Sequence, residues 1–158
     1  MVNQILAISM LCLIIFTGCT RTTVINEGEF YEFCQSKITN DEKIEKVVIT
    51  YNTQKSLTID IYMKKGLTAD DEDFLEIYEG IKEYLWENLN ENGILSDSEL
   101  DDNELRGIKI SFLYDHGENY DTYNFNSRYY GGDTIYSADE LNVIDNFKTW
   151  SRNDRVRD

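Results

Sequence analysis

Three segments of this chain alternate apolar and polar residues, and this pattern constrains the fold more than any other feature. In an extended strand successive side chains point to opposite faces, so each segment has one face to bury. The segments KVVITYN, SLTIDIYM and GIKISFLYD therefore predict strands, with apolar faces formed by Val47, Ile49, Tyr51, Leu57, Ile59, Ile61, Met63, Ile108, Ile110, Phe112 and Tyr114. The polar residues 52–55 between the first two strands predict a hairpin.

The remaining elements are indicated by turn residues, helix caps and helical spacing. Residues 120–130 predict a fourth strand, and Gly131-Gly132 predicts a turn into a short fifth strand around 134–136. Apolar residues at helical spacing predict helices at 29–38 and 74–89. Ser137 and Glu140 form a capping box, which predicts a last helix extending to Trp150.

These elements predict the fold class and the domain organisation. Their order, αββαββ(β)α, favours an α+β fold with an antiparallel sheet of four to five strands and helices packed mainly on one face. Residues 29–150 are expected to form a single small domain, which residues 151–158 follow as a polar C-terminal tail.

The N-terminus carries a targeting pattern. An apolar run extends from Ile5 to Phe16 and is shorter than the roughly 20 residues that a membrane-spanning helix needs. The run ends in Phe16-Thr17-Gly18-Cys19, which resembles the lipobox of bacterial lipoproteins. The resemblance implies a signal peptide at 1–18, lipidation of Cys19 with fatty acids such as palmitate, and a tether at 19–28. The protein would then sit on the extracytoplasmic face of the cell membrane; an uncleaved N-terminal anchor is the alternative.

Composition restricts the partners. The chain has 30 Asp and Glu against 15 Lys and Arg, a net charge of -15, and all of these residues follow Gly18. Nucleic acid binds proteins through Lys and Arg, so no nucleic-acid partner is expected. Partners should be cationic, neutral or metal ions, unless the acidic surface serves solubility alone.

Cysteine usage excludes a disulfide scaffold. Cys12 would leave with the signal peptide and Cys19 would carry lipid, so Cys34 would remain as the one free thiol. An apolar core must therefore hold the domain together. Cys34 shares its predicted helix face with Phe30 and Ile38, which favours a buried small hydrophobe over a nucleophile.

One segment resembles the calcium-binding loop of EF-hand proteins. In residues 88–99, the ligand positions are occupied by Asn88, Asn90, Asn92, Ile94 and Glu99. The resemblance implies a weak Ca²⁺ site, because Glu99 is the single ionised ligand at these positions. The alternative is a helix stop at Asn92-Gly93 followed by a capped acidic turn. No other cofactor is expected.

The fourth predicted strand carries a candidate binding surface. If Tyr123 and Phe125 face the core, then Asn124, Asn126, Arg128 and Tyr130 share the outer face by alternation. Tyr and Asn supply rigid contact area and adaptable hydrogen bonds, the mix found at protein-binding and saccharide-binding surfaces. The alternative is an ordinary strand whose polar face meets water.

Residues suited to catalysis are few. His116 is the one histidine and lies between Asp115 and Glu118, which are also typical turn residues. The chain has no GxSxG, HExxH or paired CxxC motif. The sequence therefore predicts a lipid-anchored extracytoplasmic protein that binds a protein or glycan of the cell envelope, or serves as an accessory subunit, without being an enzyme. The alternatives are a cell-envelope hydrolase that uses His116 and a weak calcium-binding module.

Overall fold

The computed structural model describes residues 21–38, 42–67, 71–88, 105–115, 117, 119–130 and 143–155. These residues form six strands and two helices. Their bounds, in chain order, are β1 Thr22–Ile25, α2 Glu29–Ile38, β2 Ile44–Asn52, β3 Ser56–Met63, α3 Asp71–Asn88, β4 Gly107–Asp115, β5 Tyr120–Arg128 and β6 Trp150–Arg155.

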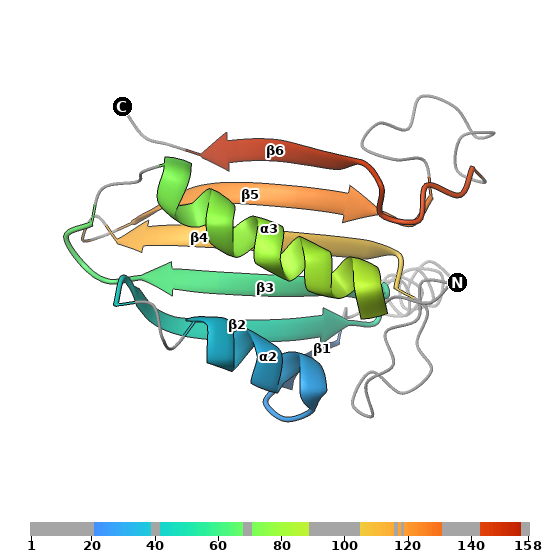
Figure 1. The fold of residues 1–158 in the computed structure, drawn as a ribbon, viewed down its shortest axis with the longest axis horizontal. Helices are drawn as coiled ribbons and strands as arrows, with labels where there is room; N and C mark the ends of the chain where they lie inside the picture. Colours follow the sequence, from blue (N-terminus) through green and yellow to red (C-terminus); the bar gives the residue numbers. More distant parts are fainter. Residues whose placement is uncertain are drawn as a thin grey trace, which may run out of the picture.

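The strands form one mixed sheet in the order β1-β2-β3-β4-β5-β6. All neighbours are antiparallel except β3 and β4, which are parallel. Parallel neighbours need a crossover connection, and α3 lies between them in the chain. Figure 1 shows α3 running diagonally across the middle of the sheet and α2 lying over β2 on the same side.

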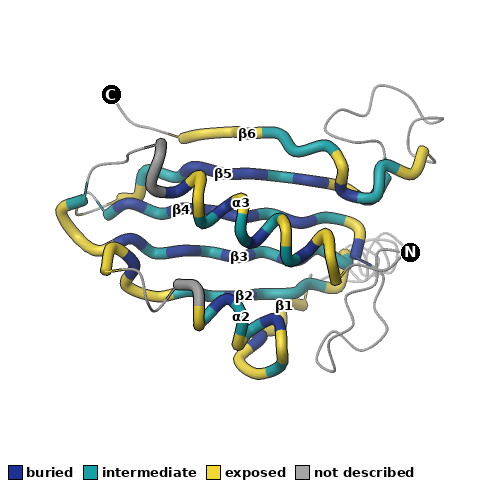
Figure 2. The backbone as a smooth tube through the Cα atoms, viewed as in Figure 1, coloured by how far each residue is buried: buried dark blue, intermediate teal, exposed yellow. Residues whose placement is uncertain are grey.

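The core fills the space between the helices and one face of the sheet. The alternating apolar residues of β3 and β4 all face this space and are almost fully buried. Figure 2 shows the buried residues concentrated along the central strands. From the helix side, Phe74 enters an aromatic cluster with Phe112 and Phe125, at ring-centroid distances of 5.3 and 5.9 Å. Helix α2 contributes Phe33, which stacks on Tyr84 of α3 at 3.9 Å.

The predicted hairpin between β2 and β3 is present, and side-chain chemistry explains its geometry. Asn52 Oδ1 accepts hydrogen bonds from the backbone N–H groups of Gln54 at 2.9 Å and Ser56 at 3.2 Å. Lys55 adopts φ 62° to close the turn. Such Asx turns replace backbone hydrogen bonds that a tight turn leaves unmade.

The predicted fold class is wrong. In place of an α+β domain with an antiparallel sheet of four to five strands in the order αββαββ(β)α, the described residues form a six-stranded mixed sheet with two helices. Residues 22–25, expected in the tether, pair with β2 as β1. Trp150–Arg155, expected to end a helix and begin a tail, pairs with β5 as β6. The expected strand at 134–136 and the first part of the expected last helix lie outside the described residues.

Candidate functional site

The face of the sheet turned away from α2 and α3 is polar. It carries the side chains that alternate with the buried residues, and the strand register aligns them in rows across four strands. One central row consists of Thr58, Lys109, Asn126 and Ser151. The neighbouring row consists of Asp60, Ser111, Asn124 and Asn153. We call these two rows, with Arg128 and Arg155 at their borders, the polar groove.

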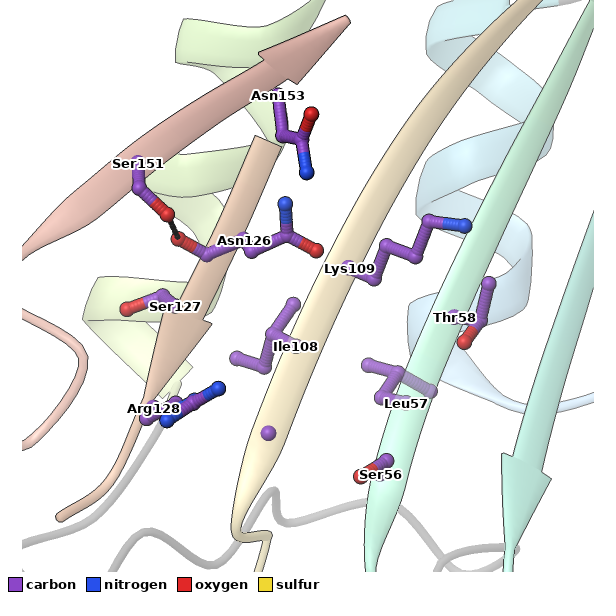
Figure 3. A pocket seen from close by; sticks show the side chains of 11 residues that line it. Ser56, Leu57, Thr58, Ile108, Lys109, Asn126, Ser127, Arg128, Ser151 and Asn153 are labelled. Carbon is purple, nitrogen blue, oxygen red and sulfur yellow. Dashed lines mark hydrogen bonds between the residues drawn. The ribbon is translucent and has the colours of Figure 1, made fainter. Parts of the chain in front are cut away.

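Two hollows make this surface concave. The first has a volume of about 500 Å³ and lies over the row of Lys109 and Asn126. The second, of about 460 Å³, lies over the row of Ser111 and Asn124. The two hollows share Lys109, Asn126 and Asn153, so they form one continuous depression. In Figure 3 the helices lie behind the sheet, and the amides of Asn126 and Asn153 point toward each other.

The floor of the polar groove contains two polar atoms without a partner. Ser111 and Asn124 face each other across β4 and β5 and are 1% and 7% exposed. The Asn124 amide nitrogen donates to the Asn153 carbonyl oxygen at 2.8 Å. Among the described residues, Ser111 Oγ and Asn124 Oδ1 have no hydrogen-bond partner. Leaving a buried polar group unpaired costs roughly 1–3 kcal/mol, so this pair requires an explanation.

Aromatic side chains border one end of the groove. Tyr62 lies beside Leu113, which lines the second hollow. The Tyr62 ring meets that of Tyr120 edge to face at 5.8 Å, and Lys46 Nζ lies 4.3 Å from the Tyr62 ring centroid. Burial, followed by the neighbouring Asp60 and Tyr120, raises the pKa of Tyr62. Tyr62 therefore keeps its phenol proton at neutral pH and can donate a hydrogen bond.

The structure places three of the four residues expected on the outer face of β5 together. Asn124, Asn126 and Arg128 line the hollows. Tyr130 instead lies beyond the end of β5, where it forms an isolated bridge with Ile144 and contacts the ring of Tyr129 at 4.6 Å. Tyr130 thus packs against the core and is not a groove residue.

Sequence reasoning missed the groove residues that come from the other strands, namely Thr58, Asp60, Lys109, Ser111, Ser151, Asn153 and Arg155. In β3 and β4 the signal was available, because these polar residues occupy the positions that alternate with the core residues. The strand order and the register determine which of these residues become neighbours. Both depend on pairing between strands that lie far apart in the chain.

Cys34, expected as a buried small hydrophobe in preference to a nucleophile, is 0% exposed. Burial raises the pKa of its thiol to about 12, so at neutral pH Cys34 is protonated and out of reach of a substrate. His116 lies outside the described residues. A nucleophilic role for Cys34 therefore receives no support from the part of the chain that the structure describes.

The buried thiol makes stability depend on pH. The ordinary pKa of a cysteine thiol, which applies to the unfolded chain, is 9.0, and the pKa of Cys34 in the folded protein is about 12. The folded state therefore holds the proton more tightly. Stability is retained below pH 9.0 and falls as pH rises toward 12. We expect the free energy of unfolding, measured by urea denaturation, to fall by roughly 1 kcal/mol between pH 9.0 and 10.0.

The control is Cys34→Ala, which removes the titrating thiol and should flatten this pH dependence. The window ends at 10.0 because burial and Glu79 raise the pKa of Tyr78 from that value to about 12, which adds a second titration. An equal slope in both proteins would show that Cys34 does not titrate on unfolding.

The other expected sites fall largely outside the described residues. Cys19 does so, as do Asn90, Asn92, Ile94 and Glu99 of the expected calcium loop. Asn88 ends α3 and donates its side-chain amide to the Tyr84 carbonyl oxygen at 2.8 Å. Within the described ranges, His, Cys, Asp and Glu do not gather in groups of three or more suited to a metal ion.

No helix among the described residues combines the length and the apolar character needed to cross a membrane. Comparisons with models of known protein families, with curated proteins and with solved structures find no match to this chain.

Proposed function

We propose that this chain is a lipid-anchored, extracytoplasmic, non-enzymatic binding protein whose polar groove holds a hydroxyl-rich ligand, a glycan of the cell envelope. The observation that carries this proposal is the unpartnered pair on the groove floor, Ser111 Oγ and Asn124 Oδ1. Natural proteins rarely leave such atoms unpaired, so an exception calls for a functional explanation or a bound partner. Here the exception lines a hollow on a face that the described helices leave uncovered.

The chemistry of the floor selects a hydroxyl group. The Ser111 hydroxyl can donate a hydrogen bond, whereas Asn124 Oδ1 can only accept one. A ligand hydroxyl accepts and donates at once and therefore satisfies both atoms. The surrounding groove repeats the same chemistry, because Asn126, Asn153 and Ser151 offer further amides and a hydroxyl. A ligand that presents several hydroxyl groups matches this arrangement better than an apolar one.

Access to the floor requires a side chain to move. Ser111 Oγ and Asn124 Oδ1 are shielded from water, so a ligand reaches them only after a neighbouring side chain rotates. Three side chains line both hollows, those of Lys109, Asn126 and Asn153, and their rotation would open the floor. Ligand binding would thus rearrange the groove and supply the hydrogen bonds that the two floor atoms lack.

The lipid anchor is the second part of the proposal and rests on the sequence. The lipobox-like Phe16-Thr17-Gly18-Cys19 follows an apolar run too short to span a membrane. The first strand of the described fold begins at Thr22, a few residues after Cys19. An anchor at Cys19 would therefore hold the sheet close to the membrane, where envelope glycans are within reach.

The test compares two serine-to-alanine variants of the full-length protein in neutral detergent. Ser111→Ala removes the hydroxyl donor from the floor, and we expect about tenfold weaker binding on an array of neutral and acidic oligosaccharides. The same variant should gain roughly 1 kcal/mol in unfolding free energy, because it removes an unpaired buried hydroxyl. Binding and stability would then change in opposite directions, which a general loss of structure cannot produce.

The matched control is Ser36→Ala on α2, an exposed serine whose hydroxyl donates to the Phe33 carbonyl oxygen on the other side of the sheet. It should leave saccharide binding unchanged. Equal binding by both variants, or a protein that binds none of the arrayed saccharides, would refute the proposed function.

A further inference from the structure

The polar groove reverses the charge balance of the chain. Across the whole sequence, acidic residues outnumber basic ones by 30 to 15. In the groove, Lys109, Arg128 and Arg155 accompany a single carboxylate, that of Asp60. The protein as a whole has a net charge of -15. A locally positive surface on it attracts anions that the rest of the surface repels.

These three cations have no ion pair among the described residues, although other cations of this protein do. Lys82 contacts Glu79 at 3.0 Å on α3, and Arg152 contacts Asp154 at 2.7 Å on the opposite side of β6. The groove cations thus retain their capacity to bind an external anion. An arginine can hold a carboxylate or a phosphate group through two parallel hydrogen bonds.

The spacing of the cations fits an extended ligand. Arg155 pairs with Thr122 at one end of β5, Lys109 pairs with Asn126 along the same strand, and Arg128 ends it. From Thr122 to Arg128 an extended strand measures about 20 Å. Such separation suits a chain with anionic groups at intervals, whereas a single inorganic ion would contact only one of the three cations.

We propose that the ligand of the polar groove is an acidic saccharide, a sugar chain that carries carboxylate or phosphate groups. This inference rests on the proposed function and specifies its ligand. The floor atoms of Ser111 and Asn124 receive a sugar hydroxyl, and Lys109, Arg128 and Arg155 receive the acidic groups. Asp60, in the row of Ser111, accepts a hydrogen bond from a further hydroxyl.

Charge density separates this ligand from other polyanions. Nucleic acid and anionic membrane surfaces bring closely spaced charges against the whole protein, whose net charge of -15 opposes their approach. A saccharide with widely spaced acidic groups places its charge within the groove alone. Screening keeps the repulsion from the remaining surface small beyond about 8 Å at physiological ionic strength.

The experiment uses one pair of probes with the same sugar backbone, an oligogalacturonate and its neutral methyl ester. Binding to the full-length protein in neutral detergent is measured by calorimetry. We expect the acid to bind at least tenfold more tightly than the ester and to weaken as salt is added. Lys109→Gln should weaken binding of the acid about tenfold more than it changes binding of the ester, because the ester has no carboxylate for the ammonium group to hold.

Lys82→Gln is the matched control, since it removes a cation from the helical side of the molecule. It should bind both probes as the unmodified protein does. Equal affinity for acid and ester, with both weakened about tenfold in Ser111→Ala, would overturn the acidic ligand and retain the proposed function. Binding of neither probe would overturn this inference, whereas the proposed function would be overturned only if the protein also bound none of the arrayed saccharides. Equally tight binding of a single-stranded oligonucleotide would also overturn the inference, because the groove would then be a general polyanion site.

Discussion

Replacing Phe74 by alanine is expected to lower the free energy of unfolding by about 3–5 kcal/mol, a large part of the stability of an ordinary domain. Phe74 is 0% exposed. Its ring lies 5.3 Å from that of Phe112, 5.2 Å from that of Tyr123 and 5.9 Å from that of Phe125. The Arg152 guanidinium lies 5.0 Å from the same ring. Truncation therefore leaves a cavity where α3, β4, β5 and β6 meet.

The control for this prediction is Leu75→Ala, the next residue of α3, which is 37% exposed. Truncation of Leu75 should cost only about 1 kcal/mol, because a partly exposed side chain loses less buried apolar surface and leaves no closed cavity. Urea denaturation followed by circular dichroism measures both variants. Similar losses for Phe74→Ala and Leu75→Ala would contradict the placement of α3 on the sheet.

Replacing Cys19 by serine is expected to abolish lipid attachment. Each buried methylene contributes about 0.8 kcal/mol to membrane binding, so two or more acyl chains anchor a protein stably, whereas one chain binds only marginally. The measurement is incorporation of labelled palmitate in bacterial cells, together with the mass of the N-terminal peptide. The unmodified protein should yield a peptide that begins with a diacylated Cys19, and the variant should carry no label.

Cys34→Ala is the control, since it removes a buried thiol and leaves the lipobox-like segment intact. It should take up palmitate as the unmodified protein does. An intact Met1 in the unmodified protein, or label retained by the Cys19→Ser variant, would contradict the anchor. The groove would then have to be considered for another compartment.

Local pattern identified much of the secondary structure. The segments of β2 to β5, the hairpin at 52–55, and both helices were indicated by alternation and by helical spacing. These signals are local because they depend on which face of an element must be buried. Cys34 was also expected on a buried face, and it is 0% exposed.

The sheet itself could not be predicted to the same extent. The helix between β3 and β4 was a signal for a parallel crossover, and an antiparallel sheet was predicted in spite of it. Residues 22–25 form a segment of only four residues, Thr-Thr-Val-Ile, and residues 150–155 are rich in polar and charged residues; most residues of both segments are exposed. Edge strands often have this composition, which resembles that of tails and linkers and gives no alternating apolar pattern.

The candidate site was found in part. Alternation along β5 identified Asn124, Asn126 and Arg128, and it also included Tyr130 because the strand was expected to continue. Because β5 ends at Arg128, the alternation of side chains does not extend to Tyr130, which does not lie on the groove face. The unpaired atoms of Ser111 and Asn124 depend on the pairing of β4 with β5, which the sequence pattern does not specify.

The most direct test of the proposed binding face is the location of a bound acidic saccharide. Isotopically labelled full-length protein in detergent micelles would be titrated with oligogalacturonate while its backbone amide resonances are recorded. We expect the largest shifts at Ser111, Asn124 and Asn153 in the groove, with Lys82 on α3 unchanged. Shifts confined to α2 and α3, or no shifts at all, would contradict a binding site on the polar face of the sheet.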